Sequence, residues 1–66
     1  MSVAKVIEIT ASSPTSFAEA TKVGIAKAAE TIHGIKGAWV SEQRVVVEND
    51  AVTEFRVTLR ISFVLD

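Results

Sequence analysis

The sequence predicts an α+β fold: a single β-α-β-β domain with a three-stranded antiparallel sheet, in strand order 1-3-2, wrapped on one helix. Three observations support it. Residues 52–65 alternate between apolar and polar side chains, the period of a strand with one dry face. Residues 14–32 place apolar and small side chains at helical spacing. A polar turn at residues 48–51 separates two runs rich in β-branched residues.

The first strand is expected at residues 3–10, where four of eight residues are valine or isoleucine. Ser13 and Pro14 then predict a helix start, with serine as N-cap and proline at the first helical position. Gly34 is expected to end the helix as its C′ residue. Gly24 costs about 1 kcal/mol of helix propensity relative to alanine, which suggests a close approach to the sheet. The expected buried stripe is Phe17, Ala20, Thr21, Gly24, Ile25, Ala28 and Ile32.

Residues 38–48 and 52–65 form the expected second and third strands, joined by the hairpin turn Glu48–Ala51. The third strand is the longest and most regular, which suits a central position and an antiparallel order of 1-3-2. A right-handed β-α-β crossover is the competing topology. The helix is expected to cover the dry face, while Glu54, Arg56, Thr58 and Arg60 lie on the other face.

Sixty-six residues allow one domain, residues 1–66, and a chain this short buries only about 60% of its unfolded surface. It has no cysteine, and 48% of its residues are apolar, so we expect self-association to complete the burial. The net charge of −1 argues against nucleic acid as a partner. No apolar run approaches a membrane span and no signal peptide is evident, so we expect a cytoplasmic protein with no membrane partner.

No catalytic or metal signature is evident, and an enzyme is not expected. The single histidine, His33, is interpreted as a surface residue at the end of the helix. The run Glu48–Asp50 is either a hairpin turn or an oxygen cluster for calcium. Arg44, Arg56 and Arg60 could bind a phosphate or carboxylate, or pair with Glu42 and Glu54 across the strands. Trp39 could be a core or interface residue, or a surface for stacking a flat ligand.

The whole chain resembles the dodecin family. The resemblance rests on five segments in order: V-A-K-V-I-E-I-T at residues 3–10, S-S-P-T-S-F at 12–17, A-E-T-I at 29–32, A-W-V-S-E-Q at 38–43, and E-F-R-V-T-L-R-I-S-F-V-L-D at 54–66. It implies a three-stranded sheet wrapped on a helix and a hollow homododecamer. It also implies storage or sequestration of riboflavin or flavin mononucleotide (FMN), without turnover, by stacking on tryptophan.

The familiar flavin-binding members have tryptophan at the position of Gly37, glutamine at that of Arg56 and, in several FMN binders, arginine at that of Val64. A shift of two residues keeps Trp39 on the same sheet face as Gly37. Arg44 matches a position implicated in phosphate binding.

The resulting hypothesis is a non-enzymatic, flavin-binding homododecamer. Trp39 would stack on the flavin ring, Gln43 and Arg56 would hydrogen-bond its edge, and Arg44 would contact a phosphate. The alternative is a dodecin-like shell that binds calcium or another small ligand, with Trp39 structural at the subunit interface.

Overall fold

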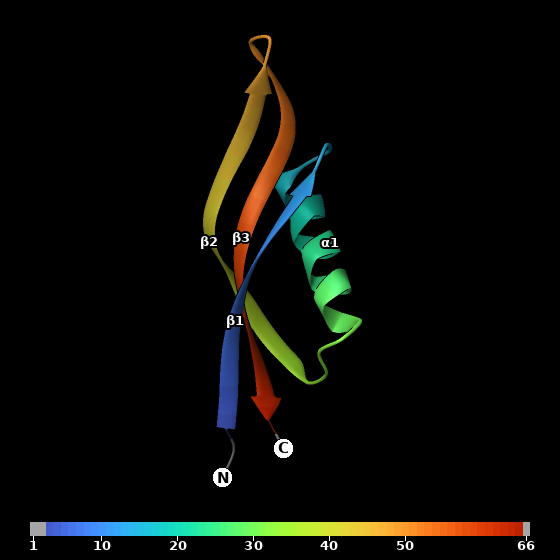
Figure 1. The fold of residues 1–66 in the computed structure, drawn as a ribbon, viewed down its shortest axis with the longest axis vertical. Helices are drawn as coiled ribbons and strands as arrows, with labels where there is room; N and C mark the ends of the chain where they lie inside the picture. The colour runs from blue at the N-terminus through green and yellow to red at the C-terminus, as the bar shows by residue number, and fades with distance from the viewer. Residues whose placement is uncertain (1–2, 66) are drawn as a thin grey trace.

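The computed structural model describes residues 3–65 and contains four elements in the expected order (Figure 1). They are strand β1 (Val3–Ser13), helix α1 (Phe17–Ala29), strand β2 (Ile35–Glu48) and strand β3 (Ala51–Leu65). The strands form one antiparallel sheet in the order β1-β3-β2. The predicted fold class and strand order are therefore confirmed, and the β-α-β crossover is excluded.

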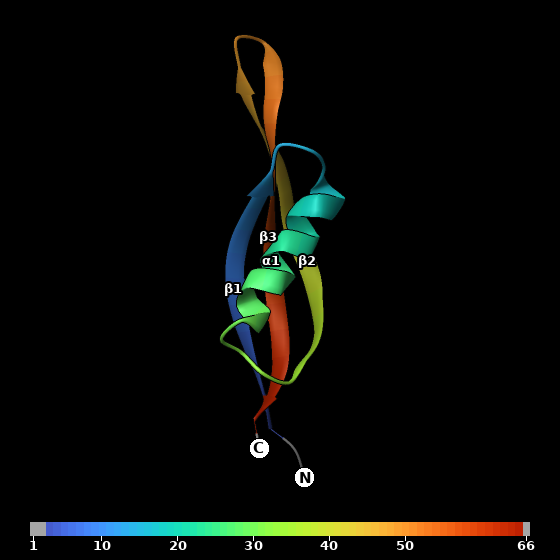
Figure 2. The same cartoon turned by 90° about the vertical axis from the view of Figure 1, so that its right-hand side faces the viewer.

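Helix α1 covers one face of the sheet and leaves the other face bare, as two views at right angles show (Figures 1 and 2). The alternation along β3 sets this arrangement, because Val57, Leu59 and Ile61 all point toward the helix and are at most 1% exposed. On the helix, the buried residues are Ala20, Gly24 and Ala28. The predicted stripe is thus the buried one, and its small side chains let the helix lie close to the sheet.

Gly24 marks the closest approach between α1 and the sheet. A Cβ atom added there would lie 2.9 Å from Ala11 Cβ and 3.0 Å from Leu59 Cδ1. Both distances are well below the roughly 3.5–4.0 Å of a comfortable contact between carbon atoms. The expected close contact at this glycine is therefore present.

The two ends of α1 differ from the prediction. Ser16, not Ser13, is the N-cap, and its Oγ accepts a hydrogen bond from the Glu19 backbone N–H at 3.0 Å. The spacing of Ser16 and Glu19 is that of a capping box, a signal that the Ser-Pro pair obscured. Ser13 instead ends β1, where its Oγ accepts a hydrogen bond from the Thr15 N–H at 3.0 Å and the residue is 3% exposed.

At its other end, α1 stops at Ala29, before the predicted glycine. The last turn tightens, because the Thr31 N–H and the Ile32 N–H both donate to the Ala28 carbonyl. Gly34 does have a positive φ of 79°, but it serves the loop into β2, and its carbonyl accepts from the Val64 N–H at 3.2 Å. Gly34 is therefore a turn residue between α1 and β2, not the C′ residue of the helix.

The β2–β3 hairpin extends beyond the rest of the fold (Figure 1). Its turn residues Asn49 and Asp50 have φ of 52° and 62°, as the sequence of the turn predicted. Strand β1 ends opposite Phe55, so the start of β3 pairs with β2 alone. Val47 and Val52 in this arm are 57% and 51% exposed. An isolated two-stranded ribbon is marginal in water, so this arm is a natural contact for another chain.

Candidate functional site

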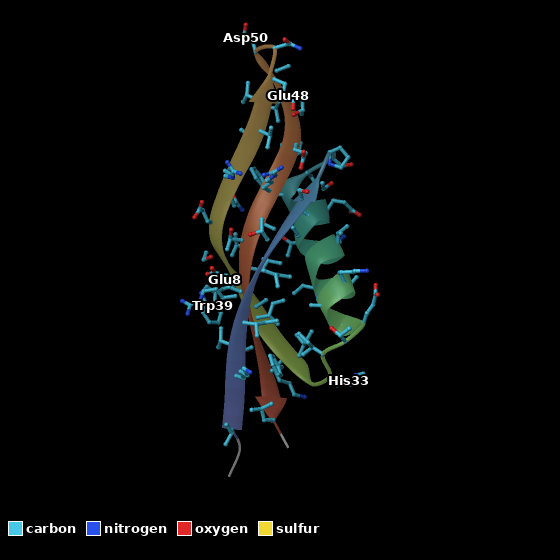
Figure 3. All side chains as sticks on the ribbon, in the orientation of Figure 1. Glu8, His33, Trp39, Glu48 and Asp50 are labelled. Atoms are coloured by element: carbon cyan, nitrogen blue, oxygen red, sulfur yellow. The ribbon has the colours of Figure 1, made fainter. Side chains whose placement is uncertain are left out.

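The sheet face opposite α1, called the open face below, carries most of the polar side chains of the strands. Its members follow from the cross-strand register, because residues paired in an antiparallel sheet point to the same side. Trp39 pairs with Arg60, and Arg60 pairs with Glu8 on the far strand. Figure 3 shows Trp39 and Glu8 on this side of the sheet, away from the helix. Its other members include Ala4, Val6, Thr10, Ser12, Gly37, Glu42, Arg44, Val46, Glu54, Arg56, Thr58, Ser62 and Val64.

An irregularity in β2 decides which of its side chains join Trp39. The register shifts between Val40 and Glu42, so that Ser41 is an extra residue in the strand. Its hydroxyl donates to the Thr58 carbonyl on β3 at 3.2 Å. Such a bulge reverses the alternation of faces beyond it. Arg44, five residues after Trp39, therefore lies on the same face as the indole, although regular alternation would put it on the opposite one.

Gln43 lies on the other side of the sheet from Trp39. It pairs with Val57, whose side chain packs against the helix, whereas Arg44 pairs with Arg56 on the open face. Of the four predicted flavin-binding residues, the structure brings Trp39, Arg44 and Arg56 to one face of the subunit and separates Gln43 from them. A regular strand would have placed Trp39 and Gln43 together, and the bulge at Ser41 is the physical reason that it does not.

Trp39 is 47% exposed, a large accessible fraction for the single tryptophan of the chain. The guanidinium of Arg60 lies over its ring, with Cζ 5.1 Å from the ring centroid, which is a cation–π contact. Gly37 lies two residues before Trp39 and faces the same way, as expected, since it pairs with Ser62 on the open face. A Cβ at Gly37 would meet only Ser62 Oγ, at 3.8 Å, so there is room above the backbone beside the indole.

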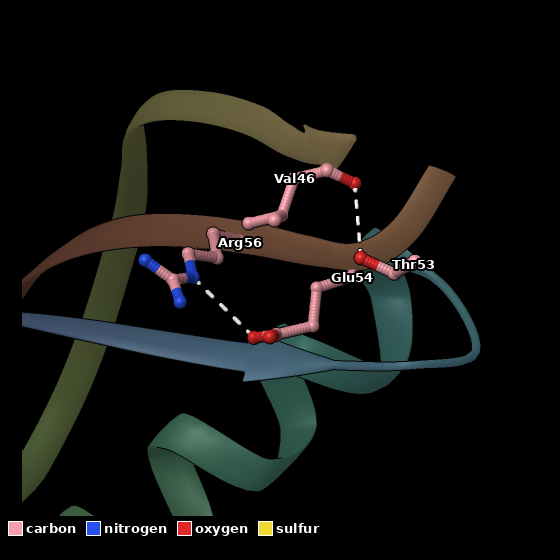
Figure 4. A network of polar contacts seen from close by, with 4 residues as sticks. All are labelled: Val46, Thr53, Glu54 and Arg56. Carbon is pink, nitrogen blue, oxygen red and sulfur yellow. Dashed lines mark hydrogen bonds and ion pairs between the residues drawn. The ribbon is translucent and has the colours of Figure 1, made fainter. Parts of the chain in front are cut away.

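Arg44 and Arg56 form a second feature of the open face, because they lie directly opposite each other on β2 and β3. Arg56 Nε donates to Glu54 Oε1 at 3.3 Å (Figure 4). The Ser12 hydroxyl, the Arg56 guanidinium and the charge of Arg44 together lower the pKa of Glu54 below its ordinary value of 4.5. Among residues 3–65 the only ion pairs are this one and Lys27–Glu30, so Arg44 makes no direct ion pair and instead faces Arg56, an arrangement that suits an anion.

The sequence predicted Arg60 only as one of three arginines that could bind an anion or pair with a carboxylate, and not as a partner of Trp39. Its partnership with Trp39 depends on the strand order and on the cross-strand register, which pairs the two residues. Counting back from the hairpin turn, where Glu48 pairs with Ala51, does give the Trp39–Arg60 pair, because the irregularity between Val46 and Val47 and the bulge at Ser41 shift the count by one residue in opposite directions.

The other candidates from the sequence lie elsewhere. His33 is exposed in the loop between α1 and β2, and Glu48 and Asp50 are at the tip of the hairpin (Figure 3). In the described part of the chain, no three histidine, cysteine, aspartate or glutamate side chains are grouped as a metal site would require. Within residues 3–65, no helix is long and apolar enough to cross a membrane.

A groove of about 550 Å³ runs between α1 and β1, on the side of the sheet away from Trp39. Its walls are mainly apolar, and Lys27 and Glu30 are among the few charged residues in its lining. It contains no group of convergent polar side chains comparable to the open face. Because Val23 in its wall is 46% exposed, the groove is better suited to covering by protein than to recognition of a polar ligand.

Comparison with known proteins identifies relatives over the full length of the fold. The family model for dodecin matches residues 3–66. Calcium dodecin from Mycobacterium tuberculosis is 36% identical over 63 residues, which cover 96% of this chain and 89% of the relative. The crystal structure of that calcium-chelating protein has a TM-score of 0.86 at 33% identity and covers 97% of this chain and 91% of its own. Dodecin from Streptomyces davaonensis has a TM-score of 0.94 at 28% identity, with coverage of 98% and 96%.

Proposed function

The chain belongs to the dodecin family, and from this premise we propose that it binds flavin without turnover, in a homododecamer, with Trp39 stacked on the flavin ring. The observation that carries the proposal is the indole on the open face: it is 47% exposed, and the position beside it on the same face is glycine. A flat aromatic ligand needs an accessible ring face and lateral room, and both are present. Flavin supplies a planar ring system with hydrogen-bonding groups at its edge.

Arg56 and Arg44 would serve the polar parts of the ligand. Arg56 is about one-third exposed and shares the open face with Trp39, so its guanidinium could donate to a carbonyl at the ring edge. Arg44, with no carboxylate partner among residues 3–65, would contact the phosphate if the ligand is FMN. Gln43 lies on the opposite face and is not part of the site that one subunit would supply.

Assembly follows from surfaces that one subunit leaves uncovered. Strand β2 lies at an edge of the sheet, and helix α1 packs on β1 and β3. Val40 and Val45, on the helix side of β2, are 40% and 37% exposed, while Trp39 is exposed on its other side. An exposed apolar edge strand tends to recruit another chain. A homododecamer would cover these surfaces and bring tryptophans from different subunits toward one ligand.

Binding without chemistry fits the residues around Trp39. The groups nearest in register are Arg60, Glu8 and Ser62, and the single histidine lies in a separate loop. General acid–base catalysis needs a proton-transfer group placed against the reacting atom. Glu8 is the one carboxylate among these groups, and it lies on β1, on the far side of Arg60 from Trp39. The site would therefore hold the flavin and quench its excited state by electron transfer from the indole.

A titration of riboflavin with protein, followed by flavin fluorescence, tests the proposal. Wild type should quench the emission and saturate near one flavin per subunit. Stacking on an aromatic side chain is worth about 1–3 kcal/mol, so Trp39→Ala should weaken binding by roughly 5- to 150-fold in equilibrium dialysis, which does not depend on quenching by the indole. Trp39→Phe should recover part of the loss. Lys22→Ala removes an exposed side chain from α1, on the other side of the sheet, and should bind as wild type does. If Trp39→Ala lowers the stability of the assembly but leaves riboflavin affinity unchanged, the stacking role is wrong.

Calcium binding is a second candidate, favoured by the relative that is named calcium dodecin. Since residues 3–65 of one chain hold no cluster of three metal-binding side chains, such a site would need backbone oxygens or a second subunit. Calorimetric titration of the assembled protein with calcium chloride distinguishes the two candidates. Saturable heat that Trp39→Ala does not change, together with no riboflavin quenching, would support calcium over flavin.

A further inference from the structure

We propose that Arg60 tunes the ligand preference of the Trp39 site by holding a positive charge against the indole, and that this charge shifts the affinity of the site toward the anionic, reduced form of a flavin. This inference rests on the flavin-binding function proposed above. It assigns a role to a residue that would act through Trp39 rather than by touching the flavin, and Arg60 is therefore a positioning residue.

The geometry around Arg60 offers its guanidinium two partners. Glu8 lies across from it on β1 and Trp39 lies across from it on β2, both on the open face. The guanidinium lies over the indole, 5.1 Å from the ring centroid, and no ion pair between Arg60 and Glu8 occurs within the usual 4.0 Å limit. The arginine is exposed, and its charge is left without a contacting carboxylate in residues 3–65.

This contact has a steric consequence and an electrostatic one. Arg60 covers one face of the indole, which directs a stacked ring to the other face. A ring stacked there, about 3.5 Å beyond the indole, would lie roughly 8–9 Å from the guanidinium. At an effective dielectric of about 30, between the value of about 20 for pairs near a protein surface and about 80 for water, a unit charge at this distance changes the relative affinity for an anion by about tenfold.

A flavin is a suitable reporter of that charge. Its oxidised ring is neutral, whereas its reduced ring carries a negative charge at N1 in mildly alkaline solution, and charge near this position tunes the potential of the ring. A cation behind the indole also makes the indole a poorer electron donor to the oxidised ring. Both effects favour the reduced form relative to the oxidised form, and both disappear if the charge is removed.

The decisive experiment is the midpoint potential of protein-bound riboflavin at mildly alkaline pH, since riboflavin has no phosphate to complicate the charge balance. Arg60→Met keeps the length of the side chain and removes its charge. It should lower the affinity for reduced relative to oxidised riboflavin by about tenfold, which corresponds to about 30 mV toward negative potential for a two-electron couple. Arg60→Lys keeps the charge and should stay near the wild-type potential.

Lys22→Met is the matched control, because it removes one positive charge from an exposed position on α1, far from the indole in the fold. Riboflavin bound to Lys22→Met should have the same midpoint potential as riboflavin bound to wild type. If Arg60→Met also binds riboflavin at the wild-type potential, the inference is wrong even though the stacking function stands. If Arg60 had a purely structural role, its replacement would change the stability of the assembly, and riboflavin bound to Arg60→Met and to Arg60→Lys would have the same midpoint potential.

A flavin-free measurement keeps the inference testable if riboflavin does not bind, the result that would overturn the proposed function itself. Trp39 is the only tryptophan and the chain has no tyrosine, so its fluorescence reports on this site alone. The Arg60 charge should concentrate iodide near the indole, and Arg60→Met should lower iodide quenching relative to neutral acrylamide. Equal iodide-to-acrylamide ratios for wild type and Arg60→Met would show that the charge does not act on the indole.

Discussion

Replacement of Gly24 by alanine should destabilise the protein, although alanine is the better helix former. Alanine would gain about 1 kcal/mol of helix propensity at this position. Its Cβ, however, would lie 2.9 Å from Ala11 Cβ and 3.0 Å from Leu59 Cδ1. The Ala11 methyl is fixed to the β1 backbone, and Leu59 is fully buried, so the helix itself must move outward. Overpacking of this kind costs about 1–3 kcal/mol, and two short contacts place the cost at the upper end, for a net loss of about 1–2 kcal/mol.

Urea denaturation at a fixed subunit concentration measures this effect, because the stability of an assembly depends on concentration. Ala26→Gly, at an exposed position of the same helix, calibrates the propensity term alone and should cost about 1 kcal/mol. Adding Ala11→Gly to Gly24→Ala removes the shorter contact and should make the alanine at position 24 less costly in that background. If Gly24→Ala instead stabilises the protein by about 1 kcal/mol, propensity has prevailed and the close approach of α1 to β1 is wrong.

Two further predictions concern the charges of the open face. Glu54→Gln should destabilise the protein near neutral pH, because the pKa of Glu54 is lowered from 4.5 by Ser12 and Arg56. The ionised carboxylate stabilises the fold above pH 4.5 and loses this effect as pH falls through its lowered pKa. The denaturation curves of wild type and Glu54→Gln should therefore converge in acid. A stability difference between the two proteins that persists in acid would contradict this role of Glu54. Arg44→Ala should lower the affinity for FMN by up to about fivefold, the contribution of an exposed ion pair, and leave the affinity for riboflavin unchanged in paired titrations. Equal losses of affinity for both ligands would contradict the phosphate contact.

Much of the fold could be predicted because its signals are local and repeated. The alternation along β3 identifies Val57, Leu59 and Ile61 as the dry face, and these three are the largest fully buried side chains. The spacing of small residues along α1 likewise identifies the face that the helix buries. The hairpin turn follows from Asn49 and Asp50, which tolerate positive φ. The ends of α1 were harder, because Ser13 and Ser16 are both good caps and the hydrogen bond that selects Ser16 is a property of the folded chain.

The candidate site was only partly predictable, because it depends on the register between strands. Trp39, Arg44 and Arg56 do share a face, but for β2 this results from the extra residue at Ser41 rather than from simple alternation. The same bulge moves Gln43 to the other face. No local composition marks a bulge in a polar stretch such as S-E-Q-R, so a prediction from regular alternation of side chains assigns the wrong face beyond it. The Arg60–Trp39 contact joins residues far apart in the sequence and becomes visible only once the two strands are paired.

Fluorescence titration of riboflavin with the wild-type protein asks whether an indole at position 39 stacks on a flavin. The proposed function predicts strong quenching that saturates near one flavin per subunit and disappears in Trp39→Ala. Unquenched flavin emission at subunit concentrations far above those of the ligand would contradict it. In that case Trp39 would be a residue of the subunit interface, and the ligand of the shell would have to be sought among ions and small anions.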